Sequence, residues 1–363
     1  MKNLKLITLM LCIIIATACK KEKDSATDYS IEAGGGGSYI LRQDHTLWAC
    51  GYNREGQLGD GTYTNKNKLI KITGNVKAIS SSTQILVLKT DNTLWACGNN
   101  TYGQLGDGTN INSNQLIKIT DNVKAIDAGL NHSLILKTDN TLWACGNNTY
   151  GQLGDSTNTN SKQLIKITEN VKAMCSRGEH TLVLKIDNTL WACGNNAYGQ
   201  LGDGTNTNSN QLIKITDNVK AIDAGLNHSL LLKTDNTLWA CGENKFGQLG
   251  DGTNTNSNQL IKIIENVKAM NAGIYHTLVL KTDNTLWACG YNAEGELGDE
   301  TNINRNQLTK ITEDAKTMSA GFDFTLVLKN DNTLWSCGNN AYGQLGDGTL
   351  TNRNTLTPMH IPW

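Results

Sequence analysis

The sequence has little of what several common protein classes require. Its 32 Lys and Arg residues are matched by 33 Asp and Glu residues, so no basic excess indicates binding to nucleic-acid phosphates. Proline is nearly absent, with 2 residues in 363. One long apolar run, Leu6 to Ala16, stands out, and it is too short to span a bilayer as a helix. We therefore expect neither a nucleic-acid-binding protein nor a membrane-spanning one.

The first residues have the pattern of an export signal. Lys2 and Lys5 precede the apolar run, and small residues then lead to Cys19. The sequence A-T-A-C that ends at Cys19 is similar to a bacterial lipobox, although alanine replaces the usual leucine three residues before the cysteine. We predict a lipoprotein signal peptide over residues 1–18, lipidation of Cys19 and a charged tether over residues 19–28. The alternative is an ordinary signal peptide cut just before Cys19.

This segment also predicts a location. A lipidated protein would be exported and held at the outer membrane or cell surface by its lipid alone. If the signal is an ordinary one, the protein would instead be periplasmic or secreted.

Self-similarity dominates the rest of the chain, where glycine (36 residues) and asparagine are plentiful. One unit, residues 219–266, contains four short apolar segments, VKAID, HSLLLK, TLWAC and QLIKI, which we predict to be strands. Asp235-Asn236 is a predicted two-residue hairpin turn, because both residues tolerate positive φ angles. The string Leu-Trp-x-Cys-Gly marks each unit, at intervals of 47 residues once and 48 residues five times, with its tryptophan at Trp48, Trp95, Trp143, Trp191, Trp239, Trp287 and Trp335.

Seven units of four antiparallel strands predict an all-β fold, a seven-bladed β-propeller over residues 29–363. A linear β-solenoid is the alternative, but it would need atypical capping units at its ends. The predicted domain starts and stops at the same phase of the repeat. We therefore predict that the ring is closed by pairing of the first strand, near Tyr29 to Ala33, with the last, near Leu356 to Ile361, because pairing removes exposed sheet edges.

The repeat can be written Ala-Gly-x-x-His-[Ser/Thr]-Leu-x-Leu-x-x-Asp-Asn-x-Leu-Trp-x-Cys-Gly-x-Asn-x-x-Gly-Gln-Leu-Gly-Asp. It resembles the repeat of the regulator of chromosome condensation, with Trp at the usual Phe/Tyr position and Cys at the usual Trp position. The resemblance covers essentially the whole predicted domain and implies the propeller fold. The eukaryotic founder is a nucleotide-exchange factor for a small GTPase and also binds chromatin, through a β-wedge insertion and a basic tail. Neither feature is present, so exchange activity is not expected.

Ten cysteines in an exported protein suggest disulfides, but their positions argue against them. Seven occupy one repeat position, and an odd ring of equivalent residues, each equally far from both neighbours, cannot pair completely. We predict buried, reduced side chains that pack as small apolar groups. No cysteine or histidine spacing fits a zinc site, so we expect no metal and no cofactor. The seven are Cys50, Cys97, Cys145, Cys193, Cys241, Cys289 and Cys337.

Two further polar positions recur. Four units have a histidine before the second strand, and the other units have Gly37, Phe324, and Gln84 or Ile85 at that position. Because glycine and phenylalanine cannot act as a base, we predict that these histidines pack and form hydrogen bonds rather than serve as a shared catalytic base. All seven units have an aspartate in the long loop, for which we predict Asx-turn capping and leave a weak calcium site open. The histidines are His132, His180, His228 and His276; the aspartates are Asp60, Asp107, Asp155, Asp203, Asp251, Asp299 and Asp347.

One position combines a loop setting with aromatic side chains. It lies just before the glycine of Gly-x-Asn-x-x-Gly, and loops on a rigid scaffold often carry recognition. Aromatic rings provide large contact areas, and tyrosine adds a polar group. We predict a recognition rim at one end of the ring, with inter-blade packing as the alternative. The rim residues are Glu55, Tyr102, Tyr150, Tyr198, Phe246, Glu294 and Tyr342.

These patterns favour a non-enzymatic binding module at the bacterial cell envelope that recognises a protein or a glycan through one end of the propeller. No acid/base pair or nucleophile breaks the repeat symmetry, so we assign no catalytic residue. One alternative is an inhibitor of an extracytoplasmic enzyme, since a secreted bacterial β-lactamase inhibitor looks like this propeller. A lyase or hydrolase that uses the axial channel is the other. We expect a monomer that binds no nucleic acid.

Overall fold

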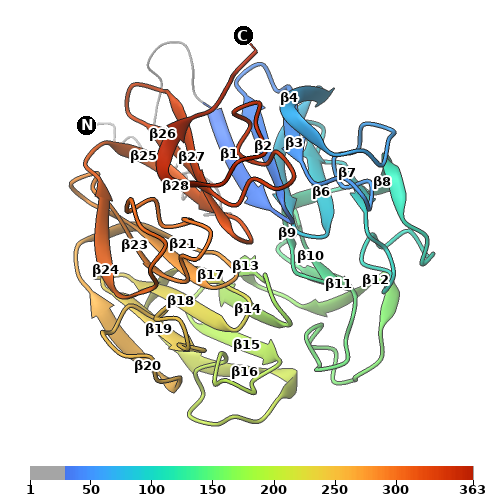
Figure 1. The fold of residues 1–363 in the computed structure, drawn as a ribbon. Helices are drawn as coiled ribbons and strands as arrows, with labels where there is room; N and C mark the ends of the chain where they lie inside the picture. Colours follow the sequence, from blue (N-terminus) through green and yellow to red (C-terminus); the bar gives the residue numbers. More distant parts are fainter. Residues whose placement is uncertain (1–28, 363) are drawn as a thin grey trace, which may run out of the picture.

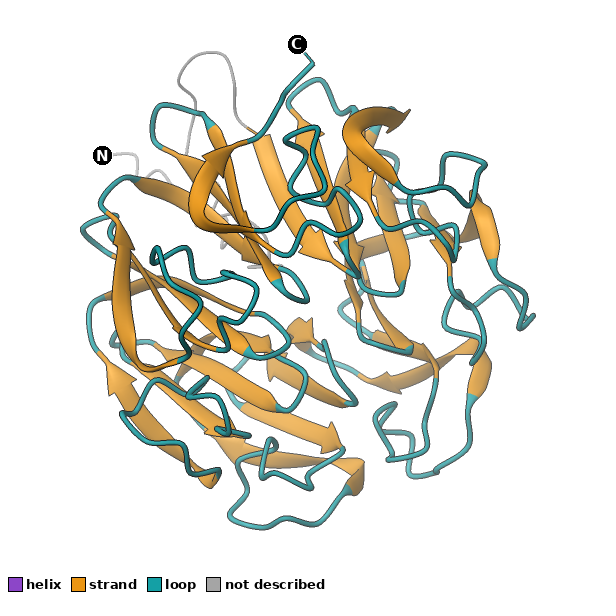
Figure 2. Ribbon diagram, in the orientation of Figure 1, coloured by secondary structure: helices purple, strands orange, loops and turns teal. Residues whose placement is uncertain are grey.

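The protein is a ring of small sheets. A computed structural model describes residues 29–362, and within them 28 strands and no helix form seven four-stranded antiparallel sheets around one axis (Figures 1 and 2). The predicted seven-bladed propeller is confirmed. The predicted signal peptide and tether lie outside the described residues. Within the described part, no helix is long and apolar enough to cross a membrane.

Each blade is one continuous chain segment, and blades 1 to 7 follow chain order. The first, inner strands are β1 (Tyr29–Gly34), β5 (Val76–Ser81), β9 (Val123–Ala128), β13 (Val171–Cys175), β17 (Val219–Ala224), β21 (Val267–Ala272) and β25 (Ala315–Ala320). The second strands are β2 (Gly37–Arg42), β6 (Gln84–Lys89), β10 (His132–Lys137), β14 (His180–Lys185), β18 (His228–Lys233), β22 (His276–Lys281) and β26 (Phe324–Lys329). The third strands are β3 (Leu47–Gly51), β7 (Leu94–Gly98), β11 (Leu142–Gly146), β15 (Leu190–Gly194), β19 (Leu238–Gly242), β23 (Leu286–Gly290) and β27 (Leu334–Gly338). The outer strands are β4 (Lys66–Thr73), β8 (Ser113–Thr120), β12 (Ser161–Thr168), β16 (Ser209–Thr216), β20 (Ser257–Ile264), β24 (Arg305–Thr312) and β28 (Arg353–Pro358).

The core lies between the blades rather than inside any one of them. In blade 5 the second and third strands are buried almost throughout, whereas the outer strand β20 is half-exposed. Leu230, Leu232 and Leu238 of this blade pack against Val267 and Val279 of blade 6. Each fully buried leucine contributes roughly 1.5–3 kcal/mol. No blade can bury its apolar face alone, so the repeat must stack on a neighbour.

The Asp-Asn turn forms as predicted. Asn236 has a φ of 63°, and the Lys233 N–H donates to the Thr237 carbonyl at 2.9 Å across the turn. Asp235 Oδ1 accepts from both the Thr237 N–H (3.0 Å) and its hydroxyl (2.6 Å). The Trp239 indole N–H then donates to that hydroxyl at 2.9 Å. The motif Asp-Asn-Thr-Leu-Trp is therefore one hydrogen-bonded unit that fixes the tryptophan.

The ring is closed, but the predicted pairing of the first and last strands is wrong. Strand β1 pairs with β2 and β28 pairs with β27, each within its own sheet. Figure 1 shows the first blade beside the last one. They meet face to face, with Ile31 and Ile40 packed against Phe324 and the Ala33 N–H donating to Ser319 Oγ at 2.9 Å. Closure therefore depends on side-chain packing and hydrogen bonds between two separate sheets.

Candidate functional site

The strand registers define two different ends of the propeller ring. His228 pairs with Gly242, and the Glu243 N–H donates to the Asn227 carbonyl at 2.8 Å. The turn between the first two strands and the long loop between the last two therefore lie at one end of each blade, which we call the loop end. The Asp-Asn turns and the links between blades lie at the other, the turn end.

The long loops are held by their own polar side chains. Asn244 Nδ2 donates to Asp251 Oδ1 at 2.9 Å, and Asn244 Oδ1 accepts from the Leu249 N–H at 3.0 Å. Thr253 donates to Asp251 through its N–H and its hydroxyl. The same aspartate position is used in this way in all seven blades, which gives it the predicted loop-capping role. Within residues 29–362, no group of three His, Cys, Asp or Glu side chains is placed to hold a metal ion.

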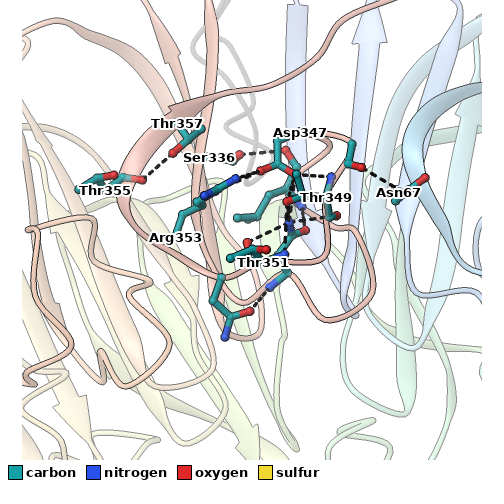
Figure 3. A network of polar contacts seen from close by, with 12 residues as sticks. Asn67, Ser336, Asp347, Thr349, Thr351, Arg353, Thr355 and Thr357 are labelled. Carbon is teal, nitrogen blue, oxygen red and sulfur yellow. Dashed lines mark hydrogen bonds and ion pairs between the residues drawn. The ribbon is translucent and has the colours of Figure 1, made fainter.

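Figure 3 shows the last of these loops, at the joint between blades 7 and 1. Thr349 Oγ1 donates to Asp347 Oδ1 at 2.7 Å, and Arg353 donates to Asp347 Oδ2 at 3.0 Å. Asn67 Nδ2 of the first blade donates to the Gly348 carbonyl at 3.3 Å. Hydrogen bonds thus hold the loops of the loop end in place, including at the joint that closes the ring.

Histidine, serine and cysteine side chains connect neighbouring blades. His180 Nε2 lies 2.9 Å from Ser229 Oγ, and that hydroxyl donates to the Gln200 carbonyl at 2.7 Å, so the histidine is the donor to the serine. The Cys241 thiol donates to the same carbonyl at 3.5 Å. Burial lowers the pKa of His180 to about 4 and raises the pKa of Cys241 to about 12. Both groups are therefore neutral packing residues at neutral pH.

The equivalent residues behave alike. In blade 2 Gln84 replaces the histidine, and its Nε2 donates to Ser133 Oγ at 3.2 Å. All eight cysteines of the described chain, Cys175 included, are buried and free.

The predicted rim lies at the loop end, at the seams between blades. None of its seven residues is fully buried: Tyr102, Tyr198 and Tyr342 expose 36%, 37% and 39% of their surface, and the other four are half-buried. Phe246 packs on two tyrosines of the next blade, Tyr275 and Tyr291, with ring centroids 5.3 and 5.0 Å away. Tyr342 similarly packs on Tyr52 of the first blade, with ring centroids 4.9 Å apart, so these two rim aromatics contact the neighbouring blade on one side and solvent on the other.

The two acidic residues of the rim, Glu55 and Glu294, instead form hydrogen bonds to the next blade. Glu55 Oε2 accepts from Asn112 Nδ2 at 2.6 Å and from Asn99 Nδ2 at 3.4 Å, both in blade 2. Glu294 accepts from Asn352 Nδ2 in blade 7. At these two positions the inter-blade interpretation describes the contacts better than a recognition role.

A ring of inner-strand side chains lines the axis, and sequence reasoning missed it. Six of its seven members accept a backbone N–H from the next blade: Asp127 accepts from Ser176 at 2.6 Å, and Asn271 accepts from Ala320 at 2.6 Å. Cys175 is the exception, since the Ala224 N–H instead donates to Asp223 of its own blade. The members are Glu32, Ser80, Asp127, Cys175, Asp223, Asn271 and Ser319.

Three members of this ring are acids. Burial raises the pKa of Asp127 to about 7 and that of Asp223 to about 6, and it raises the pKa of Glu32 well above its usual value. Arg177 is close enough to lower all three pKa values in part. It stands where most other blades have glycine, and that departure from the repeat was the signal that would have revealed the cluster.

The comparisons with known proteins agree with this architecture. A family model described as "RCC1-like domain" matches residues 15–269, and models of the regulator of chromosome condensation (RCC1) repeat match residues 267–296, 315–344 and 331–363. No curated protein matches the chain.

Among solved structures, Prp20p from Saccharomyces cerevisiae is similar with a TM-score of 0.80 and 20% identity, over 89% of this chain and 87% of that one. The structure is described together with the binding of Prp20p to Gsp1p and histones. Human WBSCR16 has a TM-score of 0.74 and 21% identity, over 84% and 87% of the two chains. These likenesses show a shared fold. Because the first family model matches well over half of its length, the chain belongs to the RCC1-like domain family.

Proposed function

We propose that this protein is a non-enzymatic binding module of the bacterial cell envelope that recognises a protein or a glycan through its loop end. One observation carries the proposal: half-exposed aromatic side chains recur around a single end of a rigid ring. Their loops are fixed by internal hydrogen bonds, so little conformational entropy is lost when a partner binds. Scaffolds of this kind typically carry recognition on their loops.

The polar groups of the blades support binding rather than catalysis. The His180–Ser229 pair has the residue types of a base and a nucleophile. However, His180 and Ser229 are fully buried, and the Ser229 hydroxyl donates to a backbone carbonyl rather than to the histidine. A serine in this arrangement has no substrate access and is not activated by the base. The pair therefore acts as a joint between blades.

The location is part of the proposal and rests on residues 1–28 alone. Their basic start, apolar run and Cys19 match a lipoprotein signal, so the ring would be tethered at the envelope. The similar fold of Prp20p, whose described partners are the proteins Gsp1p and histones, supports macromolecular recognition by such a ring.

The test uses purified whole protein incubated with envelope fractions of the bacterium. A quadruple variant replaces the four rim tyrosines Tyr102, Tyr150, Tyr198 and Tyr342 by alanine. Ile186→Ala is the matched control, because Ile186 is 51% exposed and lies at the turn end. We expect the wild type and the control to retain bound envelope material, and the quadruple variant to lose it. Equal retention by the quadruple variant, with an unchanged melting temperature, would refute a loop-end function.

A further inference from the structure

A hollow of about 280 Å³ opens on the loop end at the seam between blades 4 and 5. This volume is near the lower limit of about 300 Å³ for small-molecule pockets. Its wall consists of one aromatic ring, four amides and one hydroxyl, and no lining side chain is charged. The lining residues are Tyr198, Asn206, Asn256, Ser257, Asn258 and Gln259.

The aromatic wall is fixed in place. The Tyr198 N–H donates to Gln200 Oε1 at 3.0 Å. The next residue, Gly199, has a φ of 84°, and a Cβ there would lie 2.3 Å from the Cα of Asn258. Only glycine permits this close approach. The loop of blade 4 is therefore seated against the outer strand of blade 5, and the tyrosine ring stands beside the amides of that strand.

Hydrogen bonds within the protein orient Asn206, Asn256 and Asn258, and the last two each keep one unused polar atom. Asn258 Nδ2 donates to Asn206 Oδ1 at 3.0 Å, which leaves Asn258 Oδ1 as an acceptor. Asn256 Oδ1 accepts from the Asn244 N–H at 2.8 Å, which leaves Asn256 Nδ2 as a donor. The exposed Gln259 amide and the Tyr198 hydroxyl add one further group each. The hollow thus presents one oriented donor, one oriented acceptor and two further polar groups next to an aromatic face.

This chemistry fits one ligand class. A sugar ring places its apolar C–H face on an aromatic side chain, while its hydroxyls, each a donor and an acceptor, bind neutral amides. A phosphate, carboxylate or ammonium group would have no counter-ion in the lining. A nucleic acid would stack its bases on the tyrosine but would lack the cations that its phosphates require. We propose that the Tyr198 hollow binds a neutral sugar unit of a glycan; this rests on, and sharpens, the proposed function.

The neighbouring seam has the same set of residues. Between blades 3 and 4, Asn210 Nδ2 donates to Asn158 Oδ1 at 3.0 Å, and Asn208 Oδ1 accepts from the Asn196 N–H at 2.8 Å. Tyr150 provides the aromatic side chain there. The other aromatic seams depart from this set, for example with Lys162 in place of Asn258. Two adjacent neutral sites would bind one glycan chain together, which raises its affinity through high effective concentration.

The test measures binding of the purified protein to an array of neutral oligosaccharides built from glucose, galactose, mannose and N-acetylglucosamine, followed by calorimetry of the best binder. We expect binding that grows with chain length. Tyr198→Ala should weaken it by about tenfold or more, whereas Tyr198→Phe retains the ring and most of the affinity. Gln259→Ala, a change of an exposed side chain, should also weaken binding without lowering the melting temperature. Ile186→Ala should have no effect.

The results separate this inference from the proposed function. Binding to no oligosaccharide of the array, or binding that survives combined replacement of Tyr150 and Tyr198 by alanine, would overturn the glycan site. Loop-end-dependent retention of an envelope protein in the pull-down would still leave the proposed function standing. If Tyr198→Ala lowers the melting temperature strongly, Gln259→Ala decides between the outcomes.

Discussion

Replacing Asp127 by asparagine should stabilise the ring at pH 8 and leave it unchanged near pH 4. Asp127 accepts the Ser176 N–H of the next blade. Asn271 does the same for Ala320 through its amide oxygen, so asparagine can keep the inter-blade bond. The substitution removes a buried carboxylate that lies near the carboxylates of Asp223 and Glu32. Within residues 29–362, Arg177 is the compensating charge that lowers the pKa of Asp127.

The magnitude follows from the pKa. Burial raises the pKa of Asp127 from 3.8 to about 7, so the folded state binds the proton more tightly than the unfolded state. The stability contributed by this proton is complete below about pH 4 and is lost as the pH rises through about 7. This rise in pKa from 3.8 to about 7 corresponds to a destabilisation of roughly 4 kcal/mol at pH 8. For a domain of this size, removing it corresponds to a rise of about 6 °C in melting temperature at pH 8.

The assay is thermal unfolding of the wild type and Asp127→Asn between pH 4 and 8. The difference in melting temperature should be near zero at pH 4 and should grow between pH 5 and 7.5. Asn271→Asp is the reciprocal control, because it adds a buried carboxylate and should destabilise the ring more at pH 8 than at pH 4. If Asp127→Asn instead loses the same stability at both pH values, the carboxylate itself is required for the inter-blade joint and its burial is not what destabilises the ring at pH 8.

Three other predictions concern the joints and the anchor. Cys50, Cys145 and the other described cysteines should react with alkylating reagents only after denaturation, because burial raises the pKa of both thiols to about 12; mass spectrometry that finds native labelling or disulfides between blades would contradict this. His132→Gln should cost about 1 kcal/mol and His132→Ala about 3 kcal/mol, because Gln84 already does the same task in blade 2. Burial lowers the pKa of His132 to about 3. Between about pH 3 and pH 6.5 the unfolded state therefore binds a proton at this histidine that the folded state does not bind, and acidification to pH 4 should destabilise the wild type more than the Gln variant. Equal losses of stability in urea unfolding would argue against a buried neutral histidine. Cys19→Ala should leave unprocessed precursor, and metabolic labelling with a fatty acid that never marks the wild type would exclude the anchor.

The fold was predictable because each local signal agrees with the next one. The Asp235-Asn236 turn, the alternating strands and the repeat length all indicate four-stranded units, and the turn residue Asn236 has the positive φ that was expected. The pairing of the first and last strands was mispredicted for a physical reason. Asn266 also has a positive φ, but it links the outer strand of one blade to the inner strand of the next. An asparagine turn looks the same in sequence whether it joins paired strands or separate sheets.

The candidate site was predictable in position but not in contacts. The rim residues stand out as loop-borne aromatics, yet nothing local shows that Tyr198 lies beside Asn258, which comes from the next blade about sixty residues later. Arg177 was missed because it is a single departure from the repeat, and Tyr275 was missed because its position varies from blade to blade. Such departures identify special positions only after the fold shows which of them lie together.

Hydroxyl-radical footprinting of the purified protein, alone and saturated with the envelope fraction that it retains, locates the binding face directly. The loop-end residues Tyr102, Tyr198 and Tyr342 should be protected from oxidation by the bound partner. Ile186 and Trp191 at the turn end should be oxidised equally in both samples. Protection of Ile186 and Trp191 with unchanged oxidation of the three tyrosines would instead place the binding face at the turn end.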